Sequence, residues 1–217
     1  NLIDYAPDAD IKFFLRMFFQ KEAKTNRVIR SYGDWPTKDQ ISKLVEHIGG
    51  SFIFAATFAR YILGRIDDDI RLEEAPLTKV QQPPKDGLTP MERLELALNI
   101  NPGLDGLYAH ILSRAEESPH FPKLLLCLCL RDRHNLSNSI ADIADMLACE
   151  TFRVTEILVK LQAIVQVPGD DHTPVTFFHT SVHDFLRDEG RSHRFSSDSL
   201  LKAFGFNGFD DLQNLLT

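Results

Sequence analysis

Cysteine and long hydrophobic runs are both scarce in this sequence. Cys127, Cys129 and Cys149 are the three cysteines in 217 residues, and each lies in apolar sequence with helical spacing, as reduced core cysteines do. The longest apolar runs, 52–59 and 124–130, are far shorter than the roughly 20 residues that cross a bilayer. With no signal-peptide pattern either, the sequence predicts a cytoplasmic protein with no membrane partner.

Positive charge is in deficit as well. The chain has 24 lysine and arginine residues against 31 aspartate and glutamate residues, which gives a formal net charge of -7. A dedicated nucleic-acid surface normally shows a basic face, so we expect no nucleic-acid partner. The hydrophobic content of 43% indicates a folded protein, and the length allows one sizeable core or two small ones.

A phosphate-binding loop is also missing. The backbone N–H groups and the lysine of a G-x-x-x-x-G-K-S/T loop wrap nucleotide phosphates. The chain contains neither that motif nor a hydrophobic strand that ends in paired acids. We therefore expect no enzymatic activity from this chain alone. Residue 1 is Asn rather than Met, and we expect the chain to be part of a longer protein.

What the chain does contain is helical periodicity. Apolar residues recur at intervals of three and four, and Thr37 with Gln40 forms a capping-box pattern ahead of a helix that Gly49–Gly50 ends. The first helix, which Asp8 can cap, has several aromatic residues beyond its main apolar face, and Phe13 is one of them. We expect that face to pack against a neighbouring subdomain. Helices are expected over 9–24, 37–48, 51–63, 90–100, 104–112, 124–130, 140–147 and 154–161, and near 200–204.

A β-hairpin is expected late in the chain. The apolar stretches 164–167 and 175–178 flank a Pro-Gly-Asp-Asp turn that starts at Pro168. Because three helices precede this hairpin, the order of elements predicts a winged-helix domain.

The stretch 174–188, PVTFFHTSVHDFLRD, joins a strand to a helix at His179. Val175, Phe177 and His179 alternate as in a strand, whereas Val182 and the apolar residues after it follow helical spacing. A helix N-terminus carries unpaired N–H groups and a partial positive charge. His179 can therefore help to hold an anion such as a phosphate. Alternatively, it only caps the helix.

Three segments have sequence patterns that resemble motifs of one protein family. They are FFHTSVHDFL at 177–186, HIGGSFIFAATFARYI at 47–62 and LDGLYAHIL at 104–112. These segments resemble, in that order, three motifs of NACHT-type signalling NTPases, the STAND class, especially its large fungal families. The motifs are the H-x-S-F-x-D-F-L block of the winged helix, the G-x-F-I-Y-A-A-T-A segment of the helical lid and the L-D-x-L-Y-x-x-I-L linker helix. The resemblance covers roughly residues 8–195. Val182 departs from it, because the family usually has Phe there.

This resemblance implies a nucleotide contact. In relatives the matching histidine touches the terminal phosphate of bound ADP and holds the molecule closed, a role that would fall to His179. The turn that opens the matching lid helix lies against adenine in the wider class, which implies an adenine-side contact for Gly50, Ser51 and Phe52. The alternative at that turn is a tight helix joint without a ligand. ADP or ATP would bind only together with an upstream ATPase core.

The resemblance also implies a fold and a switch. We expect a mostly α chain with a helical lid at 1–66, a connector with a short helix at 67–103, a linker helix and winged helix with one small β-hairpin at 104–190, and a tail at 191–217. Lid and winged helix would close over a nucleotide in a preceding NACHT core. Exchange of ADP for ATP would open the molecule and let it self-associate, as in innate-immunity-like signal transduction.

Other interpretations stay open. One is a stand-alone α-helical interaction scaffold, a degenerate paralogue that kept the fold and lost the switch. Another is a DNA-binding winged helix, whose third helix offers Arg153 and Lys160 but also Glu150 and Glu156. The stretch 179–184 contains the residue types of a hydrolase triad, although nothing in the sequence indicates an oxyanion site. The chain also has one Cys-x-Cys pair, although zinc usually needs four ligands.

Overall fold

The computed structural model describes residues 7–64, 87–100, 103–134 and 138–206. These residues form two compact units. The first contains the described residues up to 64 and those of 87–107, and the second contains those of 108–206. Both units are mostly helical, as the sequence predicts. The part of the expected connector at 67–86 and the end of the tail at 207–217 lie outside the described residues.

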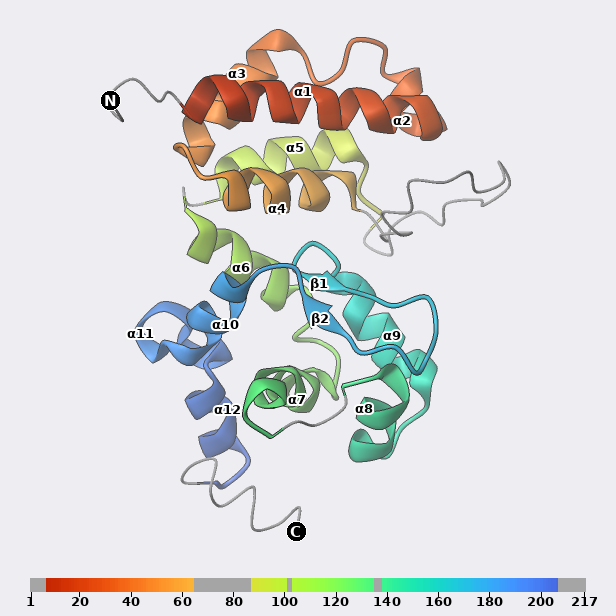
Figure 1. Ribbon diagram of the computed structural model, residues 1–217, viewed down its shortest axis with the longest axis vertical. Helices are drawn as coiled ribbons and strands as arrows, with labels where there is room; N and C mark the ends of the chain where they lie inside the picture. Colours follow the sequence, from red (N-terminus) through yellow and green to blue (C-terminus); the bar gives the residue numbers. More distant parts are fainter. Residues whose placement is uncertain (1–6, 65–86, 101–102, 135–137, 207–217) are drawn as a thin grey trace. The chain divides into compact units, whose positions relative to one another are not determined.

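Figure 1 labels the elements along the chain. The first unit contains α1 (Pro7–Thr25), α2 (Arg27–Ser31), α3 (Lys38–Ile48), α4 (Phe52–Leu63) and α5 (Pro90–Asn99). Helix α6 (Leu104–Ser113) begins in the first unit and ends in the second. The second unit continues with α7 (Phe121–His134), α8 (Ile140–Leu147), α9 (Thr151–Lys160), β1 (Val165–Gln166), β2 (Thr176–Phe177), α10 (Thr180–Arg187), α11 (Glu189–Ser192), the 3-10 helix η2 (His193–Phe195) and α12 (Ser197–Ala203). Among the described residues, no helix combines the length and the apolar composition needed to cross a membrane.

The helix ends of the first unit follow local sequence rules. The Thr37 hydroxyl accepts the Gln40 N–H at 3.2 Å, and the Gln40 side chain accepts the Thr37 N–H at 2.8 Å, so the predicted capping box is confirmed. Gly49 ends α3 with a φ of 61°, a left-handed conformation that favours glycine. Asp8 is the second residue of α1 and does not precede it, so the prediction that it caps this helix was wrong.

The first unit is organised around α1, which packs against α2, α3 and α4. Phe19 of α1 is buried and packs edge-on against Trp35, with 5.5 Å between ring centroids. Phe13 is 67% exposed and Met17 is 50% exposed, so part of the aromatic side of α1 is open in the first unit. Helix α5, expected as part of a connector, packs against α3 and α4 and therefore belongs to this unit.

In the second unit, helices α7 to α9 lead into a small antiparallel sheet. Helix α8 packs against α7 and α9, and β1 pairs with β2. An isolated antiparallel bridge joins Ser139 to Pro174, and the Val175 N–H donates to the Asn138 carbonyl at 2.9 Å. The backbone just ahead of α8 therefore lies beside the residues that enter β2. The two strands are shorter than the expected hairpin.

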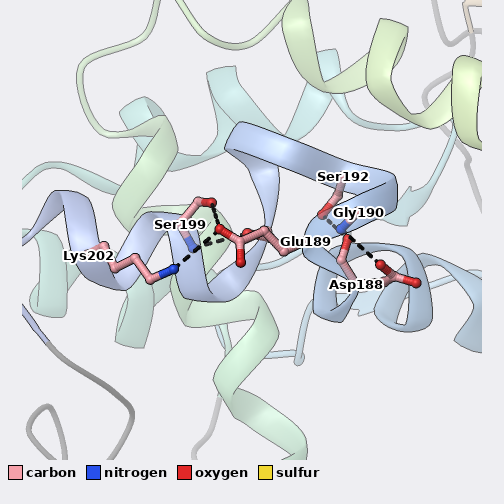
Figure 2. A network of polar contacts seen from close by, with 7 residues as sticks. Asp188, Glu189, Gly190, Ser192, Ser199 and Lys202 are labelled. Carbon is pink, nitrogen blue, oxygen red and sulfur yellow. Dashed lines mark hydrogen bonds and ion pairs between the residues drawn. The ribbon is translucent and has the colours of Figure 1, made fainter.

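The residues after α10 contain more structure than the sequence indicated. Helix α12 overlaps the expected short helix, whereas α11 and η2 are too short for apolar periodicity to reveal them. In Figure 2, Glu189 of α11 accepts hydrogen bonds from the Ser199 hydroxyl at 3.2 Å and the Lys202 ammonium at 3.3 Å, both on α12. Arg194 donates twice to the Glu116 carboxylate, at 2.6 and 2.9 Å. These contacts tie the tail into the second unit.

The capping box predicts a measurable loss of stability. Thr37→Ala removes the hydroxyl that accepts the Gln40 N–H, which costs about 1 kcal/mol at a typical N-cap. We expect a lower urea midpoint when unfolding is followed by the fluorescence of Trp35, the one tryptophan of the chain. Thr37→Ser keeps the hydroxyl and should retain most of the stability. Equal losses in both variants would show that the cap is not the cause.

The Glu116–Arg194 pair predicts a dependence of stability on pH. Hydrogen bonds from Arg194 hold the pKa of Glu116 below its ordinary value of 4.5. The pair therefore stabilises the folded state above about pH 4.5, and this contribution is lost as the pH falls through the lower folded-state pKa. Because the pair is largely exposed, we expect Arg194→Gln to lower the free energy of unfolding by less than about 1 kcal/mol at pH 7.

The loss caused by the same variant should be smaller at pH 3 than at pH 7, because the Glu116 carboxylate becomes protonated as the pH falls through its lowered folded-state pKa. Urea unfolding at both pH values, followed by circular dichroism, measures the difference. Arg16→Gln, which removes an exposed arginine that has no ion pair among the described residues, is the matched control. An equal loss at both pH values for Arg194→Gln would contradict the assignment.

Candidate functional site

His179 lies at the corner between β2 and α10. Its backbone is extended, with φ -149° and ψ 144°, and it occupies the N-cap position of α10. The Nδ1 atom of its ring accepts the Ser181 N–H at 3.0 Å. This bond satisfies one of the N–H groups that a helix start leaves unpaired. The capping role considered from the sequence is therefore present in the structure.

A hydrogen-bonded chain runs from this histidine into the core. The Ser181 hydroxyl lies 2.9 Å from His179 Nδ1 and 2.8 Å from the Tyr108 hydroxyl of α6. Tyr108 is 1% exposed, and its ring packs edge-on against buried Phe185, with 5.5 Å between centroids. The linker-helix segment and the strand-to-helix corner are thus in direct contact. The sequence placed Tyr108 in the linker-helix segment but did not indicate this contact.

The second ring nitrogen of His179, Nε2, takes no part in the helix cap. A ring nitrogen that accepts an N–H carries no proton itself, so in the neutral imidazole the proton lies on Nε2. His179 is exposed, and among the described residues its Nε2 atom has no hydrogen-bond partner. The corner therefore presents an N–H donor to solvent. Such a donor can bind a phosphate or another anion.

The predicted adenine-side residues lie in the first unit, between α3 and α4. Gly50 has a φ of 82°, and a Cβ there would meet Pro7 Cγ at 3.3 Å, so the turn requires glycine. The Ser51 hydroxyl caps α4 by accepting the Phe54 N–H at 3.3 Å. Phe52 is 42% exposed. The turn is therefore a tight helix joint that also presents an aromatic ring.

The residue types of a hydrolase triad do not assemble into one among the described residues. Ser181 contacts His179, but no carboxylate bonds to the other nitrogen of that ring, where a triad has its orienting acid. Asp184 is exposed. The ring of His183 packs edge-on against Phe177, with 4.6 Å between centroids.

The basic residues of α9 are engaged within the second unit. Arg153 lies 3.6 Å from the carboxylate of Glu156, and the Lys160 ammonium donates to the Ser118 hydroxyl at 3.2 Å. These contacts offset or occupy the two cations that a DNA-binding interpretation would use. Within the described ranges, no cluster of histidine, cysteine and acidic side chains could hold a metal ion. Burial raises the pKa of the Cys127 thiol to about 11, which disfavours the thiolate that binds metals.

Comparisons of the chain with family models, with curated proteins and with solved structures found no match.

The capping bond can be tested apart from any ligand. His179→Ala removes the Nδ1 acceptor, and we expect a loss of about 1 kcal/mol in the free energy of unfolding with faster hydrogen exchange in the first turn of α10. His179→Asp supplies a carboxylate that caps helices well, and should restore both quantities. Urea unfolding and amide exchange measure them. An Asp variant as unstable as the Ala variant would contradict a capping role.

Proposed function

We propose that this chain is the regulatory region of a NACHT-type STAND signalling NTPase. The first unit acts as the helical lid and the second as a winged helix, and both close over an ADP or ATP site in an ATPase core that precedes residue 1. The observation that carries this proposal is the exposed ring of His179 at the start of α10, where Nδ1 accepts the Ser181 N–H and Nε2 is left as the donor. His179 lies in the segment whose sequence resembles the phosphate-contacting block of that family.

The order of elements in the second unit supports the winged-helix assignment. Helix α7 is followed by a single bridged position at Ser139, then by α8 and α9, and then by the β1–β2 hairpin. A winged helix has this order of helices and strands. The hairpin ends beside α10, so the wing and the His179 corner belong to one continuous piece of backbone.

The residues of this chain fit a nucleotide held mainly by another domain. A phosphate offers acceptor oxygens, and exposed His179 offers one N–H donor that lacks a partner among the described residues. An adenine ring offers an aromatic face, and Phe52 is a partly exposed aromatic residue beside the Gly50–Ser51 turn. Neither feature alone retains a nucleotide. We therefore expect binding only when the core supplies its own phosphate loop.

The switch follows from a difference in contacts between two states. In the closed state His179 donates from Nε2 to the terminal phosphate of ADP. One hydrogen bond to a charged group is worth about 1.5–3 kcal/mol, which changes the closed-to-open ratio by roughly 10- to 150-fold. Exchange for ATP removes this contact and releases the second unit. The open state then self-associates and signals.

The open side of α1 favours this assignment over a stand-alone scaffold. A free-standing module would cover its large apolar side chains, yet Phe13 and Met17 are at least half exposed in the first unit. Apolar patches of this kind mark surfaces that a partner covers. The preceding core would supply that partner in the same chain.

Nucleotide binding in the full-length parent tests the proposal. His179→Asp keeps the helix cap but places a negative charge at the phosphate position, and we expect ADP affinity to fall at least tenfold, with a smaller effect on ATP. Calorimetry measures both affinities, and light scattering should show more spontaneous assembly. His172→Asp, the same substitution on the exposed turn between the strands, is the matched control.

Two results would reject the proposal. One is an unchanged ADP affinity and assembly state in the His179→Asp parent. The other is binding of the 217-residue chain to duplex DNA with a steep dependence on salt, which would favour a DNA-binding winged helix. Without the ATPase core, the 217-residue chain should bind neither ADP nor ATP.

A further inference from the structure

We infer that Tyr108 and Ser181 are positioning residues, which fix the ring of His179 so that its Nε2–H points outward as a preset donor for an anionic ligand. The identity of that ligand as the phosphate of ADP rests on the proposed function. The placement of the proton does not, because it follows from the hydrogen bonds of this chain alone.

The direction of the hydrogen-bonded chain is forced by its first member. His179 Nδ1 accepts the backbone N–H of Ser181 at 3.0 Å, so Nδ1 bears no proton and cannot donate to the Ser181 hydroxyl 2.9 Å away. A hydrogen bond at this contact therefore has the Ser181 hydroxyl as its donor, which shares the Nδ1 lone pair with the Ser181 N–H. At the 2.8 Å contact between the two hydroxyls, Tyr108 must in turn be the donor. Every proton thus points toward the histidine, and the ring proton lies on Nε2.

Tyr108, the buried end of the hydrogen-bonded chain, is held in place by packing. Tyr108 is 1% exposed and Phe185 is fully buried, and their rings pack edge-on at 5.5 Å. A second contact lies nearby, because the guanidinium of Arg191 is 5.9 Å from the centre of the Phe185 ring. The tyrosine hydroxyl is therefore held by aromatic packing between α6 and α10. It transmits that fixed position through Ser181 to an exposed side chain that would otherwise be free to rotate.

Fixing the orientation and tautomer of His179 before a ligand arrives should strengthen binding. An exposed histidine normally loses rotational freedom and selects a tautomer when it binds, which weakens its contribution to affinity. Here two hydrogen bonds to Nδ1 complete that selection before any ligand arrives. The residues that do so never touch the ligand. Their loss should weaken anion binding while the packing around Phe185 remains.

The first test measures the histidine ring directly. Selective 15N-histidine labelling of the 217-residue chain at about pH 8.5, where histidine side chains are neutral, should give two well-separated side-chain nitrogen signals for His179. We expect these signals to move partly toward each other in Ser181→Ala and in Tyr108→Phe, because both variants disturb the hydroxyl contacts and keep the Ser181 backbone N–H bond to Nδ1. His179→Ala assigns the signals among the eight histidines. Ser181→Thr keeps the hydroxyl and should restore the wild-type positions.

Matched controls exclude a general loss of structure. Tyr32→Phe and Ser199→Ala remove hydroxyls of the same kinds elsewhere in the chain and should leave the His179 signals unchanged. Tyr108→Phe keeps the buried ring, so its amide spectrum should stay that of a folded protein. If neither Ser181→Ala nor Tyr108→Phe moves the His179 signals, the inference is overturned, whatever the fate of the proposed function.

The second test uses ADP binding by the full-length parent. Ser181→Ala and Tyr108→Phe should each weaken ADP affinity about fivefold, or ~1 kcal/mol, the value of one typical hydrogen bond, and Ser181→Thr should restore it. If the signals move and His179→Asp weakens ADP, yet these two variants bind ADP normally, the positioning role is overturned and the proposed function stands. If the signals move but no variant, His179→Asp included, affects ADP, the positioning of the ring is supported and the proposed function fails.

Discussion

The hydrogen bond from the Ser181 N–H to His179 Nδ1 is the constraint on which the site depends. It satisfies an N–H group that would be unpaired at the start of α10, holds the imidazole in one orientation and leaves Nε2 as the donor. Through the Ser181 hydroxyl, the same ring is connected to Tyr108 on α6. One short segment of chain therefore joins a helix cap, a core contact and an exposed polar group.

The strength of this corner comes mainly from apolar burial. Burying one large apolar side chain such as Phe185 stabilises the fold by about 1.5–3 kcal/mol, whereas a typical hydrogen bond adds about 1 kcal/mol and an exposed ion pair less. The aromatic contact between Tyr108 and Phe185 thus holds α6 against α10, and the polar chain adds direction to that contact. Surface pairs such as Arg194–Glu116 attach the tail but do not determine the site.

Local sequence rules were sufficient for most element boundaries. The capping box at Thr37, the left-handed Gly49 and the short helix from Pro90 all depend on residues within four positions of each other. The short elements α2, α11 and η2 were missed, because helices of three to five residues carry no apolar period. The assignment of α5 to the first unit was also missed, since its packing partners on α3 and α4 lie far away in the sequence.

The sequence by itself determined that a strand meets a helix at His179, because alternation changes to helical spacing at that residue. Only the tertiary structure decided which ring nitrogen accepts and which one donates. That choice depends on the Ser181 backbone and on Tyr108, which lies 73 residues from Ser181 in the chain. A pattern of apolar residues predicts which side of a helix is buried, but it contains no information about which hydroxyl of one helix meets which residue of another. The contacts of Tyr108 with Ser181 and Phe185 fix that pairing.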